Sequence, residues 1–477
     1  MKFTLSPFES FVLPTRTRFP FRYGIASMTD VPQIFLRVRA SAASRAADGV
    51  AAEGLPPKWF TKNPSTTFEE DLPEMLAVIQ HATAQAATIA RTPVSFFDLW
   101  RELDRQQSHW AADRGTPPLL AHLGVSLVER AVLDAVCRIL GEPLHRALRS
   151  DALGLRLDTI YPELDAAPLD RALPGAPLPS CFVRHTVGLG DPLTAADVAP
   201  EDRVEDGLPQ DLEASIRAYG LRYFKIKLTG RSDTDLPRLE RLIALFDRET
   251  GGDWRVTLDG NENFKDFIAF RRFWEEAENS AGLRGLWPHV VVVEQPVHRD
   301  HALDAGAGEV LGDWAERPPL IVDESDGAVG DVPRALDLGY AGASHKNCKG
   351  IVKGLANAVL LRARQRAGAE VVLTGEDLAN LGPIALLQDL AMMALLGIEH
   401  VERNGHHYYR GLSMFPDAWQ ETSLEEHGDL YRRHERGFPA LRISEGRIAL
   451  ATVNRAPFGV APAFDPSVFA RVETGVF

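Results

Sequence analysis

Short apolar runs alternate with amphipathic segments throughout the chain from about residue 180 onward. Each run is rich in Val and Ile, and the segments between them space their apolar residues as helices do, as in IVKGLANAVLLRARQRAG. This alternation is typical of parallel strand and helix units. The eight runs are SCFVRHTV, YFKIKL, WRVTLD, HVVVVEQP, PLIVDES, AGASHK, AEVVLTGE and GIEHVE. Eight such units predict a closed (β/α)₈ barrel of the α/β class, since an open doubly wound sheet usually has fewer.

The sequence on either side of these units has a different character. Residues 1–150 begin with strand-like alternation and continue with helical stretches around 70–92 and 124–148, which predicts a separate α+β domain. The Pro-rich segment YPELDAAPLDRALPGAPLPS is expected to lead into a barrel domain of residues 151–430. Residues 431–477 return to strand-like alternation and are expected to pack back on the first domain.

Composition limits the classes of partner. The 477 residues include 52 Lys and Arg against 66 Asp and Glu, and the resulting net charge of −14 argues against nucleic-acid binding. No uninterrupted apolar run reaches about 18 residues and no signal-peptide pattern is present, so we expect a cytoplasmic protein that does not associate with membranes. The three cysteines, Cys137, Cys181 and Cys348, lack the spacing of a zinc site or a disulfide framework and are expected to be reduced core thiols.

Three acidic residues stand at the ends of consecutive predicted strands. Asp259 ends the third run, Glu294 ends the fourth and Asp323 ends the fifth. The carboxyl ends of barrel strands meet at one mouth, and neighbouring strands lie about 5 Å apart, so the three carboxylates should converge. They would repel one another without a cation, and ligands of this kind suit Mg²⁺. The alternative, in which each acid caps a helix or pairs with an arginine, explains three successive strands poorly.

Lysines stand at the ends of the second and sixth predicted strands. Lys225 and Lys227 are two residues apart and share one face of their strand, and Lys346 follows the sixth run. Strands two and six are opposite in an eight-strand ring, so Lys227 and Lys346 should flank a substrate carboxylate. Lys227 could then abstract an α proton, with its pKa lowered by Lys225 and the metal. A Lys-x-Lys motif on its own would more simply be a solvated strand end.

Taken together, these residues resemble the enolase superfamily, in particular the muconate-lactonizing subgroup of its mandelate racemase and muconate-lactonizing enzymes. The motifs KIK, LDGNENF, VVEQP, VDES and KNCKG occur in the family's order and at comparable spacings. The resemblance implies that the three acids bind Mg²⁺, that Lys227 and Lys346 form the acid/base pair, and that Lys225 orients the substrate carboxylate. The His and Asp dyad of mandelate racemase is not evident. The glycine spacing after Lys349 departs from the family pattern, which leaves Lys349 as a competitor of Lys346.

The resemblance also implies that the first domain caps the active site with two loops that select the substrate. Residues 22–30 and 56–65 are the candidate loops, and Trp59 would close over the ligand unless it is merely a surface aromatic. Further substrate contacts are expected from Glu376 after the seventh strand, and from Glu402 and His406 after the eighth. The alternative for the last group is packing on the barrel rim.

The expected activity is Mg²⁺-dependent abstraction of the proton α to the carboxylate of a small-molecule substrate, through an enediolate. Two lysines on opposite faces permit removal and return of a proton, which favours a racemase or epimerase. The same pair could also serve β-elimination, as in an acid-sugar dehydratase, or cycloisomerisation. A different class, a catalytically silent metal-binding barrel, remains a further alternative. The family tendency leads us to expect a homo-oligomer.

Overall fold

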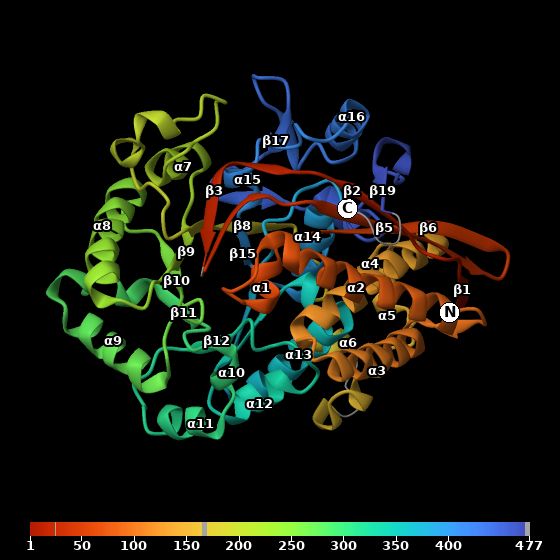
Figure 1. Ribbon diagram of the computed structural model, residues 1–477, viewed down its shortest axis with the longest axis horizontal. Helices are drawn as coiled ribbons and strands as arrows, with labels where there is room; N and C mark the ends of the chain where they lie inside the picture. Colours follow the sequence, from red (N-terminus) through yellow and green to blue (C-terminus); the bar gives the residue numbers. More distant parts are fainter. Residues whose placement is uncertain (24, 165–168, 473–477) are drawn as a thin grey trace.

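Eight parallel strands close into a barrel in the computed structural model, which describes residues 1–23, 25–164 and 169–472 (Figure 1). Each strand pairs with the next along the chain, and the last pairs with the first through His400 opposite Phe182 and Arg403 opposite His185. The predicted (β/α)₈ barrel is therefore confirmed. Its strands are β8 (Ser180–Val187), β9 (Tyr223–Lys227), β10 (Arg255–Asp259), β11 (Val290–Glu294), β12 (Leu320–Val322), β13 (Gly342–His345), β14 (Val372–Gly375) and β15 (His400–Arg403).

Helices connect successive barrel strands and form the outer layer. The strands read as near-continuous apolar runs because helices on the outside and side chains on the inside bury both of their faces. The connecting helices are α7 (Leu212–Tyr219), α8 (Ser232–Thr250), α9 (Phe267–Asn279), α10 (Arg299–Ala302), α11 (Ala305–Gly312), α12 (Asp331–Asp337), α13 (Ile351–Arg366) and α14 (Ala385–Leu396).

The N-terminal domain combines an antiparallel sheet with three long helices. The sheet has the order β19, β2, β5, β1, β7, with β6 also paired to β5, and a separate hairpin is formed by β3 and β4. Its strands are β1 (Lys2–Leu5), β2 (Glu9–Leu13), β3 (Arg16–Tyr23), β4 (Ala26–Asp30), β5 (Gln33–Ala42), β6 (Arg45–Gly54) and β7 (Val94–Ser95). Its helices are α1 (Pro57–Thr61), α2 (Phe68–Ile89), α3 (Phe96–Arg114), α4 (Pro118–Leu140) and α5 (Leu144–Arg149), followed by the short α6 (Leu169–Ala172).

The C-terminal segment joins the two parts. Strand β18 (Arg447–Ala449) pairs with barrel strand β8, and β19 (Ala470–Arg471) pairs with β2 of the N-terminal sheet. The other elements of this region are α15 (Gly405–Tyr408), α16 (Asp417–Glu426), β16 (Tyr431–Arg433), β17 (Pro439–Leu441) and α17 (Ala451–Arg455). The fold is thus a barrel with an N-terminal domain that the end of the chain completes.

Helix α4 fastens the N-terminal domain to the barrel. The buried carboxylate of Glu129 accepts hydrogen bonds from the backbone N–H groups of Ile351 (2.8 Å) and Val352 (3.0 Å), the first residues of α13. Ser126, one turn earlier, donates to the carbonyl of Asn347. Because helix N-termini carry unsatisfied N–H groups and a partial positive charge, a carboxylate there is stabilising. The end of β13 is consequently held by the N-terminal domain.

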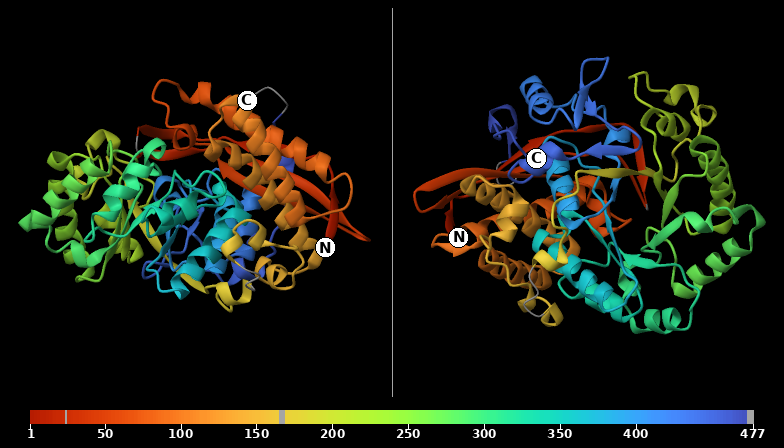
Figure 2. Two further views of the ribbon diagram at one scale, coloured as in Figure 1. Left: turned by 90° about the horizontal axis from the view of Figure 1, so that it is seen from below. Right: turned by 180° about the vertical axis from the view of Figure 1, so that it is seen from behind.

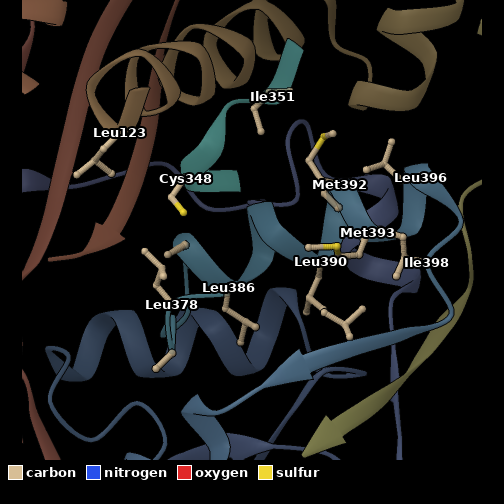
Figure 3. Close-up of a cluster of buried hydrophobic side chains, with 14 of the residues drawn as sticks. Leu123, Cys348, Ile351, Leu378, Leu386, Leu390, Met392, Met393, Leu396 and Ile398 are labelled. Carbon is tan, nitrogen blue, oxygen red and sulfur yellow. The ribbon is translucent and has the colours of Figure 1, made fainter. Parts of the chain in front are cut away.

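A continuous apolar core runs between α4, the turn after β13, and α14. Figure 3 shows Leu123, Cys348 and Ile351 near one end of this cluster and Met392, Met393 and Ile398 near the other. All of these side chains are buried, and the three cysteines of the chain are buried without a disulfide, as expected. Figure 2 shows the N-terminal sheet and helices against one side of the barrel. Among the described residues, no helix combines the length and the apolarity needed to cross a membrane.

Candidate active site

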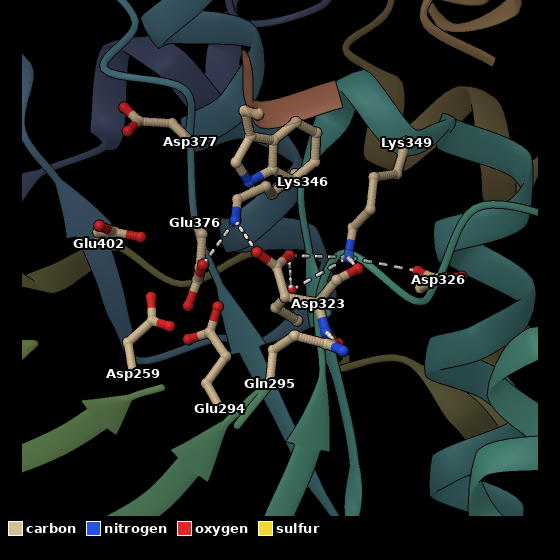
Figure 4. A network of polar contacts seen from close by, with 12 residues as sticks. Asp259, Glu294, Gln295, Asp323, Asp326, Lys346, Lys349, Glu376, Asp377 and Glu402 are labelled. Carbon is tan, nitrogen blue, oxygen red and sulfur yellow. Dashed lines mark hydrogen bonds and ion pairs between the residues drawn. The ribbon is translucent and has the colours of Figure 1, made fainter. Parts of the chain in front are cut away.

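Charged side chains from seven consecutive barrel strands meet at the carboxyl ends of those strands. Figure 4 shows the carboxylates of Asp259, Glu294 and Glu376 directed toward one another, with Asp323 and Lys346 beside them. All five side chains are buried. Residues that follow parallel strands share one rim, so segments far apart in sequence contribute to a single polar group.

Lys225 lies at the centre of four carboxylates. Its Nζ is 3.0 Å from Asp259, 2.8 Å from Glu294, 2.7 Å from Glu376 and 3.0 Å from Glu402. Burial opposes the charged form, but the carboxylates outweigh it and hold the pKa of Lys225 well above its ordinary value. All four of these neighbours are carboxylates of the protein, so Lys225 serves in this arrangement as the counter-charge of the acidic cluster.

The pKa values of Glu294 and Glu376 are shifted in opposite directions although the two carboxyl groups are neighbours. Burial, followed by the charge of Glu376, raises the pKa of Glu294 well above its ordinary value. Burial acts in the same sense on Glu376, but Lys225, Lys346 and Arg184 outweigh it and hold that pKa well below its ordinary value. The shifts differ in direction because Lys225 is the one cation beside Glu294 among the contacts above, whereas three cations surround Glu376.

Lys227 points from the end of β9 to Asp259. Its Nζ donates to Oδ2 of Asp259 over 2.5 Å, and the other oxygen of Asp259 accepts from the N–H of Asn261 (2.8 Å). Burial opposes the ionised form of Asp259, but Lys225 and Lys227 lower its pKa below the ordinary value. The sequence placed both residues in one site, and the structure brings them into direct contact.

Lys346 follows β13 and forms a second ion pair in the cluster. Its Nζ donates to Asp323 (2.6 Å) and to Glu376 (2.8 Å), and it lies 4.8 Å from the ring centre of Trp59 (Figure 4). Burial acts against the ammonium form, but Asp323 and Glu376 hold the pKa of Lys346 well above its ordinary value. The ion pairs therefore favour the ammonium form of Lys346, and its aromatic neighbour further favours a cation.

Lys349 is the other lysine of the strand-six turn, and it is absent from the lining of the small cavity that Lys346 lines. Its Nζ donates to the carbonyl of Asp323 (3.1 Å) and to Ser344 (3.0 Å), and it lies 3.4 Å from Asp326. These contacts attach Lys349 to the loop after β12 (Figure 4). The geometry accordingly favours Lys346 over Lys349 as a reacting group.

Carboxylate oxygens of Glu294, Asp323 and Glu376 lie within 4.8 Å of one another, and all three residues are buried. An all-oxygen set of this kind fits Mg²⁺. The group includes Glu294 and Asp323, two of the three ligands expected from the sequence, together with Glu376. The third expected ligand, Asp259, lies in the same cluster and pairs with Lys227 and Lys225. From the sequence we expected Glu376 to contact the substrate. No local pattern indicates that a residue after the seventh strand lies next to Glu294 of the fourth.

A small cavity of about 30 Å³ lies between the lysines and the N-terminal domain. Lys227 and Lys346 both line it, and Trp59, Phe21 and Met28 cover it from the N-terminal domain. This volume holds only very small guests such as water. A larger substrate would need the covering side chains to move. Met28 and Trp59 belong to the two candidate loops, residues 22–30 and 56–65. Gly24 of the first loop lies outside the described residues.

The 56–65 loop is held down by a charged pair on the barrel. Arg299, the first residue of α10, donates to the carbonyls of Phe60 (2.8 Å) and Trp59 (3.0 Å). Glu262, in the turn after β10, binds the same guanidinium through two hydrogen bonds of 2.8 Å and lies 3.1 Å from Lys62 of the loop. We call Glu262, Arg299 and Lys62 the loop latch. It fixes Trp59 over Lys346.

The two residues expected after the eighth strand lie in different places. Glu402 lines the cavity and accepts a hydrogen bond from Thr186 (2.5 Å) in addition to its contact with Lys225. His406 is absent from the lining of this cavity and is buried, with its Nε2 3.0 Å from Nδ1 of His185. The structure thus brings Trp59, Glu376 and Glu402 to the lysines and places His406 apart from them.

Sequence reasoning missed several residues of the site. Arg184, inside β8, forms a buried ion pair with Glu376 at 2.8 Å. A charged residue within the buried run SCFVRHTV is the same kind of signal as Lys225, so it could have been noticed. Phe21, Met28 and the latch residue Arg299 carried no comparable signal, because their positions depend on contacts between distant segments.

Comparison with solved structures identifies the fold. A mandelate racemase/muconate lactonizing protein from Herpetosiphon aurantiacus superposes with a TM-score of 0.60 at 16% identity, over 96% of this chain and 98% of that one. This chain has the fold of enolase-superfamily proteins. No protein-family model matches the sequence, and no curated protein is similar to it.

Two further superfamily structures have the same architecture. A muconate lactonizing enzyme from Pseudomonas fluorescens, solved with muconolactone, gives a TM-score of 0.55 at 16% identity over 96% of each chain. A dipeptide epimerase from Cytophaga hutchinsonii, solved with Mg and the dipeptide D-Ala-L-Val, gives 0.56 at 15% identity over 99% of each chain. At such low identity these likenesses establish the fold and leave the reaction to be argued from the site.

Proposed function

We propose that this protein is an enzyme that removes and returns the proton α to the carboxylate of a small molecule, and so acts as a racemase or epimerase. The observation that carries the proposal is that Lys227 and Lys346, from strands on different sides of the barrel, line one small cavity next to a cluster of buried acids. Two amines that reach one small volume can serve as proton acceptor and proton donor.

Mg²⁺ fits the acidic cluster, with Glu294 and Asp323 as ligands and either Asp259 or Glu376 as the third. When bound, the ion would stabilise the negative charge that develops on a substrate carboxylate after the α proton is lost. The predicted ligand Asp259 and its alternative Glu376 can be separated by comparing Mg²⁺ affinity in Asp259→Asn and Glu376→Gln.

The residues of the chain can be given roles in a two-base reaction. Lys346 holds a proton, because Asp323 and Glu376 stabilise its ammonium form, and it would deliver that proton to one face of the α carbon. Lys227 would accept the proton from the other face, and the roles reverse in the opposite direction. Trp59 and the 56–65 loop would exclude water, so that the proton on a lysine returns to the substrate rather than to solvent.

The experiment is α-proton exchange in D₂O with a panel of acid sugars, dipeptides and N-acyl amino acids. We expect Mg²⁺-dependent deuterium uptake by the wild type. Lys227→Met and Lys346→Met should each retain exchange with one stereoisomer at most and lose interconversion of the two. Lys265→Met, at an exposed lysine outside the cavity, is the matched control and should behave as the wild type. Interconversion that survives either cavity substitution would refute the two-base assignment.

Three broader expectations belong to the same proposal. The substrate is a small carboxylate and neither nucleic acid nor a membrane is a partner, in keeping with the net charge of −14. The location is cytoplasmic, and the protein assembles as a homo-oligomer. Sedimentation velocity of the purified protein tests the last of these directly.

A further inference from the structure

A second, much larger cavity lies at the opposite end of the barrel. It measures about 1060 Å³ and is lined by the amino ends of β8, β9 and β10, by the end of α7, and by the segment between β17 and β18. Reactions on such barrels take place at the carboxyl ends of the strands, so this cavity is separate from the candidate active site.

Arginine dominates the charge of this cavity. Two acids, Asp253 and Glu445, stand in its lining against six arginines. The arginines are Arg217, Arg222, Arg255, Arg432, Arg442 and Arg447. The whole chain carries a net charge of −14, whereas the lining of this cavity has four more positive than negative side chains. The local charge is therefore opposite in sign to the charge of the protein as a whole. A cleft lined mainly by one sign of charge concentrates ions of the other sign.

Two of the six arginines are already neutralised. Arg217 pairs with Glu249 at 2.7 Å and with Glu213 at 2.9 Å, and Arg222 lies 3.6 Å from Asp253. In the part of the chain that the structure describes, the remaining four form no ion pair with a carboxylate. They are Arg255, Arg432, Arg442 and Arg447.

One of the four unpaired guanidinium groups is fixed in place. Arg447 donates to the hydroxyl of Ser180 (2.8 Å) and lies 3.9 Å above the ring of Phe182, which belongs to the cavity lining. Arg432 and Arg442 are exposed at the rim. The guanidinium of Arg447 is thus held against an aromatic ring without a carboxylate partner, and exposed arginines stand near it. Their planar donor groups match the oxygens of phosphate and carboxylate groups.

We propose that this cavity binds a small anion with several negative charges, of the phosphate-ester or polycarboxylate class. The four unpaired arginines supply the charge and the planar donors, and the volume is in the range of cavities that enclose small ligands. The inference does not depend on the proposed reaction, because it rests on residues at the other end of the barrel.

Isothermal titration calorimetry of the full chain with pyrophosphate and with citrate tests the proposal. We expect one site per chain, and affinity that falls as the salt concentration rises. Arg432→Gln combined with Arg442→Gln should weaken binding by about tenfold or more, since each lost charged contact contributes strongly. The matched control combines Arg272→Gln with Arg284→Gln, which removes the same charge at exposed positions outside the cavity.

The outcomes separate the possibilities. Tighter binding of pyrophosphate assigns the phosphate class, and tighter binding of citrate assigns the polycarboxylate class. If neither anion binds at millimolar concentration, or if the control lowers affinity as much as the cavity variant does, the site does not exist. Circular dichroism of both double variants establishes that they fold, so a loss of binding can be ascribed to the cavity.

Discussion

Replacement of Arg299 should release the 56–65 loop while leaving the barrel intact. Arg299→Met keeps the length of the side chain but removes its hydrogen bonds to the carbonyls of Phe60 and Trp59. A hydrogen bond from a charged donor contributes about 1.5–3 kcal/mol, so the two together favour the closed loop by about 3 kcal/mol at the lower limit. The equilibrium for local opening should therefore rise on the order of 100-fold.

Hydrogen exchange measured by mass spectrometry reports this opening. The N–H of Trp59 bonds to the carbonyl of Pro56 and that of Lys62 to the carbonyl of Lys58, so both amides exchange only when the loop opens. We expect peptides covering residues 55–66 to exchange about 100-fold faster in Arg299→Met. Arg299→Lys should give an intermediate effect, because an ammonium group keeps the charge beside Glu262 but lacks the planar fork.

Arg272→Met, at an exposed arginine of α9, is the control for a change of surface charge. Exchange of the 55–66 peptides within about threefold of the wild type would refute the idea that the latch closes the loop. Equal acceleration in peptides from β10 and β11 would also refute it, since the substitution would then act on the whole barrel.

Three further predictions concern the rest of the molecule. Burial raises the pKa of Glu129 to about 7 from 4.5, against the hydrogen bonds that it accepts, so the folded state binds the extra proton and Glu129 should lower stability by about 3 kcal/mol as the pH rises through this interval. Urea unfolding at pH 5 and 8.5 should show a loss of stability that is smaller by about this amount in Glu129→Gln than in the wild type. Part of the loss should remain in both proteins, because burial also raises the pKa of Asp377 and of Asp389 to about 7. Gly354→Ala places a Cβ 2.3 Å from Nδ1 of His345 and should cost about 1–3 kcal/mol in thermal unfolding, whereas Gly306→Ala, which meets nothing within 4 Å, should be neutral. Mg²⁺ at about 100 times its Kd should stabilise the wild type by about 2.7 kcal/mol, and Asp323→Asn should abolish this effect.

The barrel could be predicted because its strands leave a strong local signal. Runs such as HVVVVEQP are apolar on both faces, and each is followed by a helical period, so strand number and order follow from the sequence. The rim residues could be predicted for the same reason, since Asp259, Glu294 and Lys346 stand directly after apolar runs. Helix α3 was not singled out, although Ser95 caps it through the N–H of Asp98.

The arrangement of charges within the site could not be predicted. Strand order places Lys225 near Asp259, but the choice of Glu376 and Glu402 as its other partners depends on how far each side chain reaches across the barrel. The resemblance led us to expect that Lys225 would orient the substrate, whereas here it is surrounded by protein acids. The loop latch depends on contacts between residues about 240 positions apart, as between Trp59 and Arg299. The position of Phe21 and Met28 over the cavity likewise depends on segments distant in sequence, for which no local pattern exists.

The contacts of α4 bear on how proteins with this fold can be recombined. Ser126 and Glu129 hold the turn that follows β13 and the start of α13, and that turn carries Lys346. A chimaera that joins this barrel to the N-terminal domain of another protein with this fold would disturb the strand-six lysine unless it kept a hydroxyl and an acid at these two positions. Exchange of segments of the N-terminal domain should accordingly be confined to parts such as the 56–65 loop, with α4 retained.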